Sequence, residues 1–167
     1  MIAVSNTTPL RYLIAIGQDS LLDKLFEKVF VPPAVIEELT ETGTPEFIRQ
    51  RVTSLPSWFE VCALLGISEE SFPTNLHRGE REAILLAEQL QPDVLLIDDY
   101  VGRTIALSRS LPLSGTLGVL ERADASGLIV DFPLVIEQLK SSGFYIGETL
   151  GRLLLRRHAE RRKTGQA

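Results

Sequence analysis

Cysteine, long apolar runs and a basic N-terminal segment are all scarce or missing in this sequence. The single cysteine excludes a disulfide framework and a zinc knuckle, because each needs at least two. No apolar run approaches the ~18 residues of a membrane span, and the N-terminus does not resemble a signal peptide. With 44% hydrophobic and 23% charged residues, the 167-residue chain is not disordered and suits one globular domain. We therefore expect a soluble, cytoplasmic protein in which Cys62 is a buried thiol.

Basic side chains are few in most of the chain and concentrated at its C-terminal end. Residues 152–167 hold six basic groups and one acidic group, a net charge of +5. Residues 1–151 hold 11 basic and 21 acidic groups, a net charge of -10. This asymmetry predicts a compact domain over residues 1–150 and a basic helix and tail over 151–167 with a different task. The two histidines, His77 and His158, lie far apart in sequence, and we expect both on the surface.

Short buried strands alternate with amphipathic helices along the sequence. This alternation predicts an α/β fold with a parallel sheet of four to five short strands, covered by helices on both faces. The strands are expected at 2–5, 29–31, 59–64, 94–97 and near 113, and the longer helices at 33–39, 46–52, 80–90, 101–109, 117–126, 133–141 and 148–162.

Polar residues follow two of these strands directly. Residues 5–8 (Ser-Asn-Thr-Thr) come after the first strand, and Asp98 and Asp99 come after strand 94–97. Ligands of parallel α/β sheets bind beyond the carboxyl ends of the strands. The pattern therefore indicates a site at this edge, although polar residues are also common turn formers after strands.

Two helices add acidic candidates. Glu80 lies about 50° from the middle of the apolar face of its helix, whereas Glu82 lies about 110° away. Glu80 thus points inward, although an acid in the first turn is also favoured by the helix dipole. In the helix 33–39, Glu38 flanks the buried side at about 105° and Glu37 points nearly opposite it. Glu38 is therefore the better site candidate, and Glu37 is expected in solvent.

Together these positions can gather Glu38, Glu80, Asp98 and Asp99 around one point. Clustered carboxylates repel each other, so some would take up protons unless a cation joined them. Oxygen ligands of this kind suit Mg²⁺ or Mn²⁺. Such an ion can activate water, stabilise a leaving oxygen and neutralise a phosphodiester. Because an acidic pocket repels nucleic acid, the basic tail is a candidate for phosphate contacts.

Five segments in order then resemble a known family. The sequence is similar to the PIN-domain superfamily over about residues 1–150, and most of all to its DUF3368 branch, which is related to VapC-type toxin ribonucleases. No single segment is specific enough to indicate the family, but five segments in this order are. The segments that carry the resemblance are 4–10 (VSNTTPL), 31–39 (VPPAVIEEL), 77–84 (HRGEREAI), 95–99 (LLIDD) and 115–120 (GTLGVL).

The resemblance implies a three-layer PIN-like fold and a Mg²⁺- or Mn²⁺-dependent endoribonuclease of a toxin–antitoxin module. Its implied partners are RNA, an antitoxin protein and a second copy of the chain, with no membrane. Asp99 suits the family spacing better than Asp98, which remains an alternative, and Thr116 lies where the family often has a hydroxyl. The implied catalytic residues are Asn6, Glu38, Glu80, Asp98, Asp99 and Thr116, with Asn6, Glu80, Asp98 and Asp99 as metal ligands. The expected nucleic-acid contacts are Arg78, Arg81, Arg103, Arg156 and Arg157.

Position 6 departs from the family pattern, because active PIN nucleases carry Asp where this chain has Asn6. A neutral amide oxygen is a weaker metal ligand than a carboxylate. This favours an alternative in which the chain is a catalytically weakened module that binds RNA or a protein partner. A third alternative is an unrelated phosphate-handling α/β enzyme, but the segment 115–118 lacks the lysine of a phosphate-binding loop.

Overall fold

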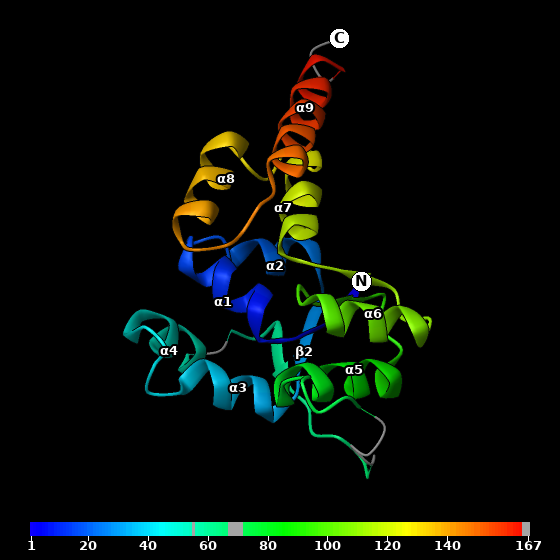
Figure 1. The fold of residues 1–167 in the computed structure, drawn as a ribbon. Helices are drawn as coiled ribbons and strands as arrows, with labels where there is room; N and C mark the ends of the chain where they lie inside the picture. The colour runs from blue at the N-terminus through cyan, green and yellow to red at the C-terminus, as the bar shows by residue number, and fades with distance from the viewer. Residues whose placement is uncertain (55, 67–71, 165–167) are drawn as a thin grey trace.

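The computed structural model describes residues 1–54, 56–66 and 72–164 and shows alternating strands and helices (Figure 1). In chain order the elements are β1 (Ile2–Ser5), α1 (Thr7–Ala15), α2 (Ser20–Leu25), β2 (Lys28–Val31), α3 (Pro33–Thr40), α4 (Glu46–Thr53), β3 (Phe59–Val61), α5 (Arg78–Leu90), β4 (Val94–Leu96), α6 (Tyr100–Ser108), β5 (Leu113–Ser114), α7 (Thr116–Ala125), α8 (Phe132–Ser141) and α9 (Glu148–Thr164).

The described strands form one five-stranded parallel sheet in the order β3-β2-β1-β4-β5. The central strand β1 pairs with β2 on one side and β4 on the other, so that Val4 lies opposite both Phe30 and Leu95. The predicted α/β class and strand number are therefore confirmed.

The sheet separates two apolar cores, because successive side chains of a strand point to opposite faces. Ala3, Val29 and Leu96 join the larger core, formed with α1, α2, α3, α4, α7, α8 and α9. Val4 and Leu95 join the smaller core, formed with α5 and α6. In Figure 1, α5 and α6 lie on one side of β2, and α7, α8 and α9 form the opposite end of the molecule. This is the predicted three-layer arrangement.

Two local predictions need correction. Strand 59–64 is shorter than expected, and Cys62 just beyond β3 is only partly buried. Because β3 is an edge strand, its outer side has no neighbouring strand to cover it. Helix α5 begins earlier than predicted, at Arg78, since the His77 N–H donates to Glu80 Oε2 at 3.0 Å and satisfies the helix start. None of the helices within the described ranges is long and apolar enough to cross a membrane.

Candidate active site

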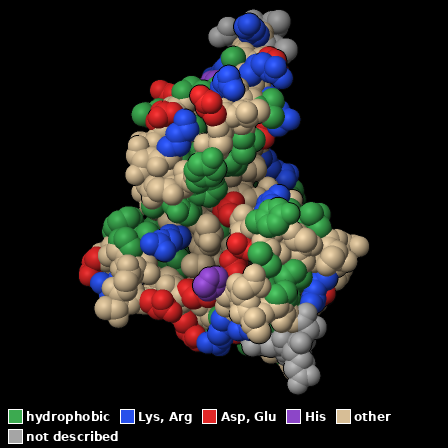
Figure 2. Space-filling view, in the orientation of Figure 1, with side chains coloured by type: hydrophobic (Ala, Val, Ile, Leu, Met, Phe, Trp, Pro, Cys, Tyr) green, Lys and Arg blue, Asp and Glu red, His purple; other side chains and the backbone are tan. Residues whose placement is uncertain are grey.

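The strand order reverses between β1 and β4. From β1 the chain builds outward through β2 and β3 on one side, and β4 and β5 lie on the other. A crevice opens at the carboxyl ends of strands where such a reversal occurs. The register pairs Ser5 with Leu96, so the residues that follow these strands, Asn6 and the Asp98–Asp99 pair, meet at this edge. In Figure 2, acidic side chains gather across the middle of the molecule.

Asn6 lies at the centre of this edge with no accessible surface. Its backbone N–H donates to Leu96 O at 3.0 Å, which fixes the residue against β4. The side-chain Oδ1 and Nδ2 atoms are buried and have no hydrogen-bond partner among the described residues. Buried polar atoms are almost always bonded to protein, water or ligand. The Asn6 amide is therefore placed for a group outside the chain itself.

Glu38 connects the starts of two helices at the same place. One carboxylate oxygen, Oε1, accepts from the Gly79 N–H of α5 at 2.7 Å. The other, Oε2, accepts from the Thr7 hydroxyl in the first turn of α1. A Cβ atom at position 79 would lie 2.5 Å from Oε2, so only glycine permits this approach. Helix N-termini favour an anion, which explains why an acid is stable here. The predicted exposure of Glu37 is confirmed, and the role of Glu38 in a site stays a prediction.

Glu80 faces other carboxylates. Only 9% of the residue is exposed, and its Oε2 accepts from the His77 N–H. Burial raises the pKa of Glu80 above its ordinary value, and the negative charges of Asp99 and Glu38 raise it further. The inward orientation predicted from the helical period is confirmed. A carboxyl group held among like charges is stabilised in its ionised form by a cation.

The two neighbouring aspartates have different surroundings. Asp99 caps α6, with its Oδ2 accepting from the Gly102 N–H at 2.7 Å, and its charge acts on Glu80. Asp98 turns toward the start of α7, where Thr116 donates its N–H to Oδ1 at 2.9 Å and its hydroxyl to Oδ2 at 2.5 Å. Burial raises the pKa of Asp98, while the Thr116 hydrogen bonds and Arg103 oppose that rise.

The predicted site residues thus separate into two neighbouring groups. Asn6, Glu38, Glu80 and Asp99 belong to the switch point between β1 and β4. Asp98 and Thr116 belong to the β4–β5 side, where Arg103 Nη1 donates to Ile97 O at 2.8 Å and Ser114 O at 3.1 Å. The second group holds α6, β5 and α7 together. Asp99 is consequently the better placed of the two aspartates to act with Glu80.

The first group has the donor chemistry of a divalent-metal site. Within the described ranges, no three Asp, Glu, His or Cys side chains form a cluster that could hold a metal ion. Mg²⁺, however, commonly keeps several waters and uses one or two carboxylates together with substrate phosphate oxygens. Glu80, Asp99 and the unpartnered amide oxygen of Asn6 fit that requirement. Burial is the main cause of the raised pKa of Glu80, and the neighbouring charges of Asp99 and Glu38 add to it.

Glu82 was expected outside the apolar face of α5, and this expectation is wrong. Its side chain is only 8% exposed, and Oε1 accepts from Arg78 Nε at 2.7 Å. Oε2 accepts from the Ala34 N–H at the start of α3 at 3.4 Å. Helix α3 packs beside α5 and covers this side, so α5 is buried on more than the face that its own period defines.

The predicted nucleic-acid contacts include arginines with internal roles. Arg78 pairs with Glu82 and with Glu37, at 2.7 Å and 2.6 Å. Arg103 binds backbone carbonyl oxygens, as described above. Arg81 lies partly buried on α5.

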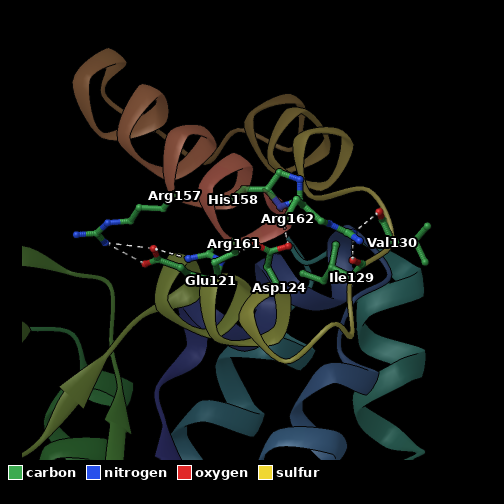
Figure 3. Close-up of polar contacts among 8 residues, drawn as sticks. All are labelled: Glu121, Asp124, Ile129, Val130, Arg157, His158, Arg161 and Arg162. Carbon is green, nitrogen blue, oxygen red and sulfur yellow. Dashed lines mark hydrogen bonds and ion pairs between the residues drawn. The ribbon is translucent and has the colours of Figure 1, made fainter. Parts of the chain in front are cut away.

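The C-terminal helix uses one face for a cluster of ion pairs with α7 (Figure 3). Asp124, with its side chain 2% exposed, accepts from Arg161 Nη2 at 2.6 Å and contacts His158 Nδ1 at 2.8 Å. Glu121 pairs with Arg157 at 3.1 Å. The expectation that His158 is a surface residue is wrong, because its side chain is 15% exposed and its ring stacks on Phe132. Arg162 donates to the carbonyls of residues 129 and 130.

The opposite face of α9 remains basic and exposed. Arg152 and Lys163 have no partner among the described residues, and Arg156 meets only Glu160, at 3.6 Å with both side chains exposed. At 100° per residue, these three basic residues lie within about 40° of each other. The tail therefore divides into a docked side and a basic outer side that includes Arg156 but not Arg157.

Sequence reasoning did not assign a role to Thr7. Its hydroxyl holds Glu38 across 31 positions of the chain. The local signal was the hydroxyl directly after Asn6 at the end of a buried strand, but its partner lies on another helix and was not visible from the sequence.

The five-stranded parallel sheet with helices on both faces agrees with comparisons with known proteins. The chain belongs to the family described as DUF3368: PIN domain, which it matches over residues 2–160. It is similar in fold to a PilT N-terminus domain protein from the hyperthermophilic archaeon Sulfolobus solfataricus P2, with 17% identity and a TM-score of 0.50. That alignment covers 89% of this chain and 98% of the other. No curated protein matches the chain.

Proposed function

We propose that this protein is an endoribonuclease that hydrolyses RNA phosphodiesters with Mg²⁺ or Mn²⁺ at the β1–β4 switch point. Two observations together carry the proposal: the side chain of Asn6 is buried with no partner among the described residues, and the pKa of Glu80 is raised by burial and by neighbouring acids. Membership of the PIN family supports the nuclease class. The carboxylate and amide oxygens of the candidate residues suit a divalent ion, which supports the proposed metal dependence.

Each residue has a distinct role in this proposal. Glu80, Asp99 and the Asn6 Oδ1 atom would hold the ion, and Glu38 acts as a positioning residue that fixes the starts of α1 and α5. When bound, a divalent ion supplies a Lewis acid that activates water and neutralises phosphate charge. Asp98 and Thr116 position α7 and the edge of the site.

The test replaces the acid at the centre of the site. Glu80→Gln should abolish saturable Mn²⁺ binding in a calorimetric titration and lower RNA cleavage by at least about 100-fold, because the residue acts on the reacting centre. Glu37→Gln is the matched control, since Glu37 is an exposed acid next to Glu38 in sequence, and it should cleave like the parent protein. Equal cleavage by Glu80→Gln and the parent would show that the site is wrong.

A second function is favoured by Asn6 itself. An amide in place of a carboxylate lowers the negative charge available to a cation, which suits a PIN module that binds RNA or a protein partner without useful turnover. Asn6→Asp separates the two proposals. A gain of metal-dependent cleavage supports a weakened nuclease, whereas metal and RNA binding with no cleavage in either form supports the binding module.

From the sequence resemblance alone, we also propose a role in a toxin–antitoxin pair in the cytoplasm, with an antitoxin protein and a second copy of the chain as partners. The exposed apolar side chains Val130 and Leu134, 92% and 52% exposed, are candidates for such contacts. Light scattering of the purified chain at several concentrations tests the homodimer. A mass that stays monomeric at every concentration contradicts it.

A further inference from the structure

An open groove of about 440 Å³ lies next to the proposed active site. Its polar side is formed by Asp98, Arg103 and the backbone of Gly115, and its apolar side by Leu117, Tyr145 and Leu150. Asp98 lines the groove and directly precedes Asp99 of the proposed active site, so the groove adjoins that site. In Figure 2, hydrophobic side chains stand directly above the acidic patch on this face.

Tyr145 is the most exposed aromatic residue of this groove, with 89% of its surface accessible. It lies in the segment between α8 and α9, and the residue before it is anchored. The Phe144 ring packs edge-on against Tyr12 at 4.9 Å between ring centres. The Tyr12 hydroxyl also donates to Gly143 O at 3.5 Å. The backbone next to Tyr145 is thus anchored, and its ring is exposed to solvent.

Two basic side chains lie on a different face of the same helix, α9. Leu150 lines the groove, and Arg152 and Arg156 line a second hollow with Thr149 and Leu153. At 100° per residue they lie about 160° and about 120° around α9 from Leu150. Arg152 has no partner among the described residues. Figure 2 shows Lys and Arg side chains along this helix. An exposed aromatic residue near exposed arginines is the combination with which proteins bind single-stranded nucleic acid.

We propose that this groove binds a nucleobase of single-stranded RNA next to the cleaved phosphodiester. The base stacks on Tyr145, and Arg152 and Arg156 contact phosphates further along the strand. The inference rests on the proposed function, because the groove shares its wall with that site. RNA is favoured over a protein partner because the acidic site repels phosphate, so that a substrate needs stacking and basic contacts beside it.

The experiment measures binding of a short labelled single-stranded RNA to the full chain by fluorescence anisotropy, with EDTA present to prevent metal-dependent cleavage. Tyr145→Ala should weaken the Kd on the order of tenfold, the usual effect of losing one base-stacking contact. Tyr145→Phe should bind nearly as well as the parent, because it keeps the ring. Phe47→Ala is the control, since Phe47 is an exposed aromatic on α4 that does not line the groove, and it should leave the Kd unchanged.

A second readout uses RNA that carries 2-aminopurine, whose fluorescence is quenched when the base stacks. Quenching by the parent and by Tyr145→Phe, but not by Tyr145→Ala, supports the inference. If Tyr145→Ala binds and quenches like the parent while Glu80-dependent cleavage persists, the groove assignment is overturned and the proposed function stands. If the parent binds no RNA in EDTA, the groove assignment is overturned, while the proposed function is decided separately by metal-dependent cleavage. Loss of a protein complex in Tyr145→Ala, with RNA binding unchanged, reassigns the groove to a protein partner.

Discussion

Two regions of this molecule concentrate charge, and they do so in opposite ways. At the β1–β4 switch point, Glu80 faces other carboxylates and Asn6 has no partner among the described residues. Between α7 and α9, the buried carboxylate of Asp124 meets Arg161 and His158. The second region is satisfied by the protein itself and holds a helix in place. In the proposed function a cation would balance the carboxylates of the first region, which makes it the better functional candidate although both regions are acidic and buried.

The largest expected effect concerns the satisfied region. Asp124→Ala leaves Arg161 and His158 without their buried acceptor and should lower the free energy of unfolding by about 3 kcal/mol. Urea denaturation followed by circular dichroism measures this loss. Arg156→Gln is the control, because its pair with Glu160 is exposed on both sides and should contribute almost nothing. A loss for Asp124→Ala no larger than for the control would show that the cluster does not stabilise the fold.

At the switch point, replacing a buried acid is expected to change the free energy of unfolding in the opposite direction. Glu80 has a raised pKa in the folded protein, so the folded state binds its proton more tightly than the unfolded state. The free energy of unfolding of the metal-free protein should therefore fall as pH rises from the ordinary carboxyl range through the raised pKa. Glu80→Gln removes this contribution, flattens the pH dependence and makes the metal-free protein slightly more stable at neutral pH.

Thermal denaturation at several pH values in EDTA tests this prediction. Asp98 also has a raised pKa, so some pH dependence should remain in the variant. A Glu80→Gln protein that is less stable than the parent at neutral pH would mean that the carboxylates do not repel each other, and the contrast between the two regions would disappear.

The smallest expected effects are those of two arginine variants that distinguish the two faces of α9. Arg157→Gln removes a partly exposed pair with Glu121 and should cost about 0.5 kcal/mol of stability without changing RNA affinity. Arg152→Gln should leave stability unchanged and weaken RNA binding a few-fold, more at low salt than at high salt. Anisotropy titrations at two salt concentrations and urea denaturation distinguish the two variants. Equal effects of both on RNA would contradict the division of the helix into a docked and a basic face.

Much of the fold could be predicted because its signals are local. Short apolar runs marked the strands, helical periods marked the helices, and the inward direction of Glu80 followed from its angle on α5. The choice of Glu38 over Glu37 followed in the same way. The helical period predicts which side chains are buried when a helix packs against a single surface. It succeeds for Glu80 and Glu38 because no second surface decides their burial.

The remainder depends on partners that are distant in the chain. Glu82 is buried because α3 covers a second side of α5, and no property of α5 alone indicates it. Arg157 and His158 are engaged because α7 presents Glu121 and Asp124 to them, 36 and 34 positions away. The concentration of basic charge in the tail could be read from the sequence, while its division into two faces could be seen only in the folded protein.

The contact between Glu38 and Gly79 has a consequence for the evolution of the family. The glutamate can reach the start of α5 only because position 79 has no side chain, so each residue restricts the other across 41 positions of sequence. A larger residue at position 79 would displace the carboxylate of Glu38, the flexible end of that side chain, and break its hydrogen bond to the backbone N–H of position 79. Relatives that keep this hydrogen bond are accordingly expected to keep glycine at position 79, whereas a lineage that has lost glutamate at position 38 is released from it.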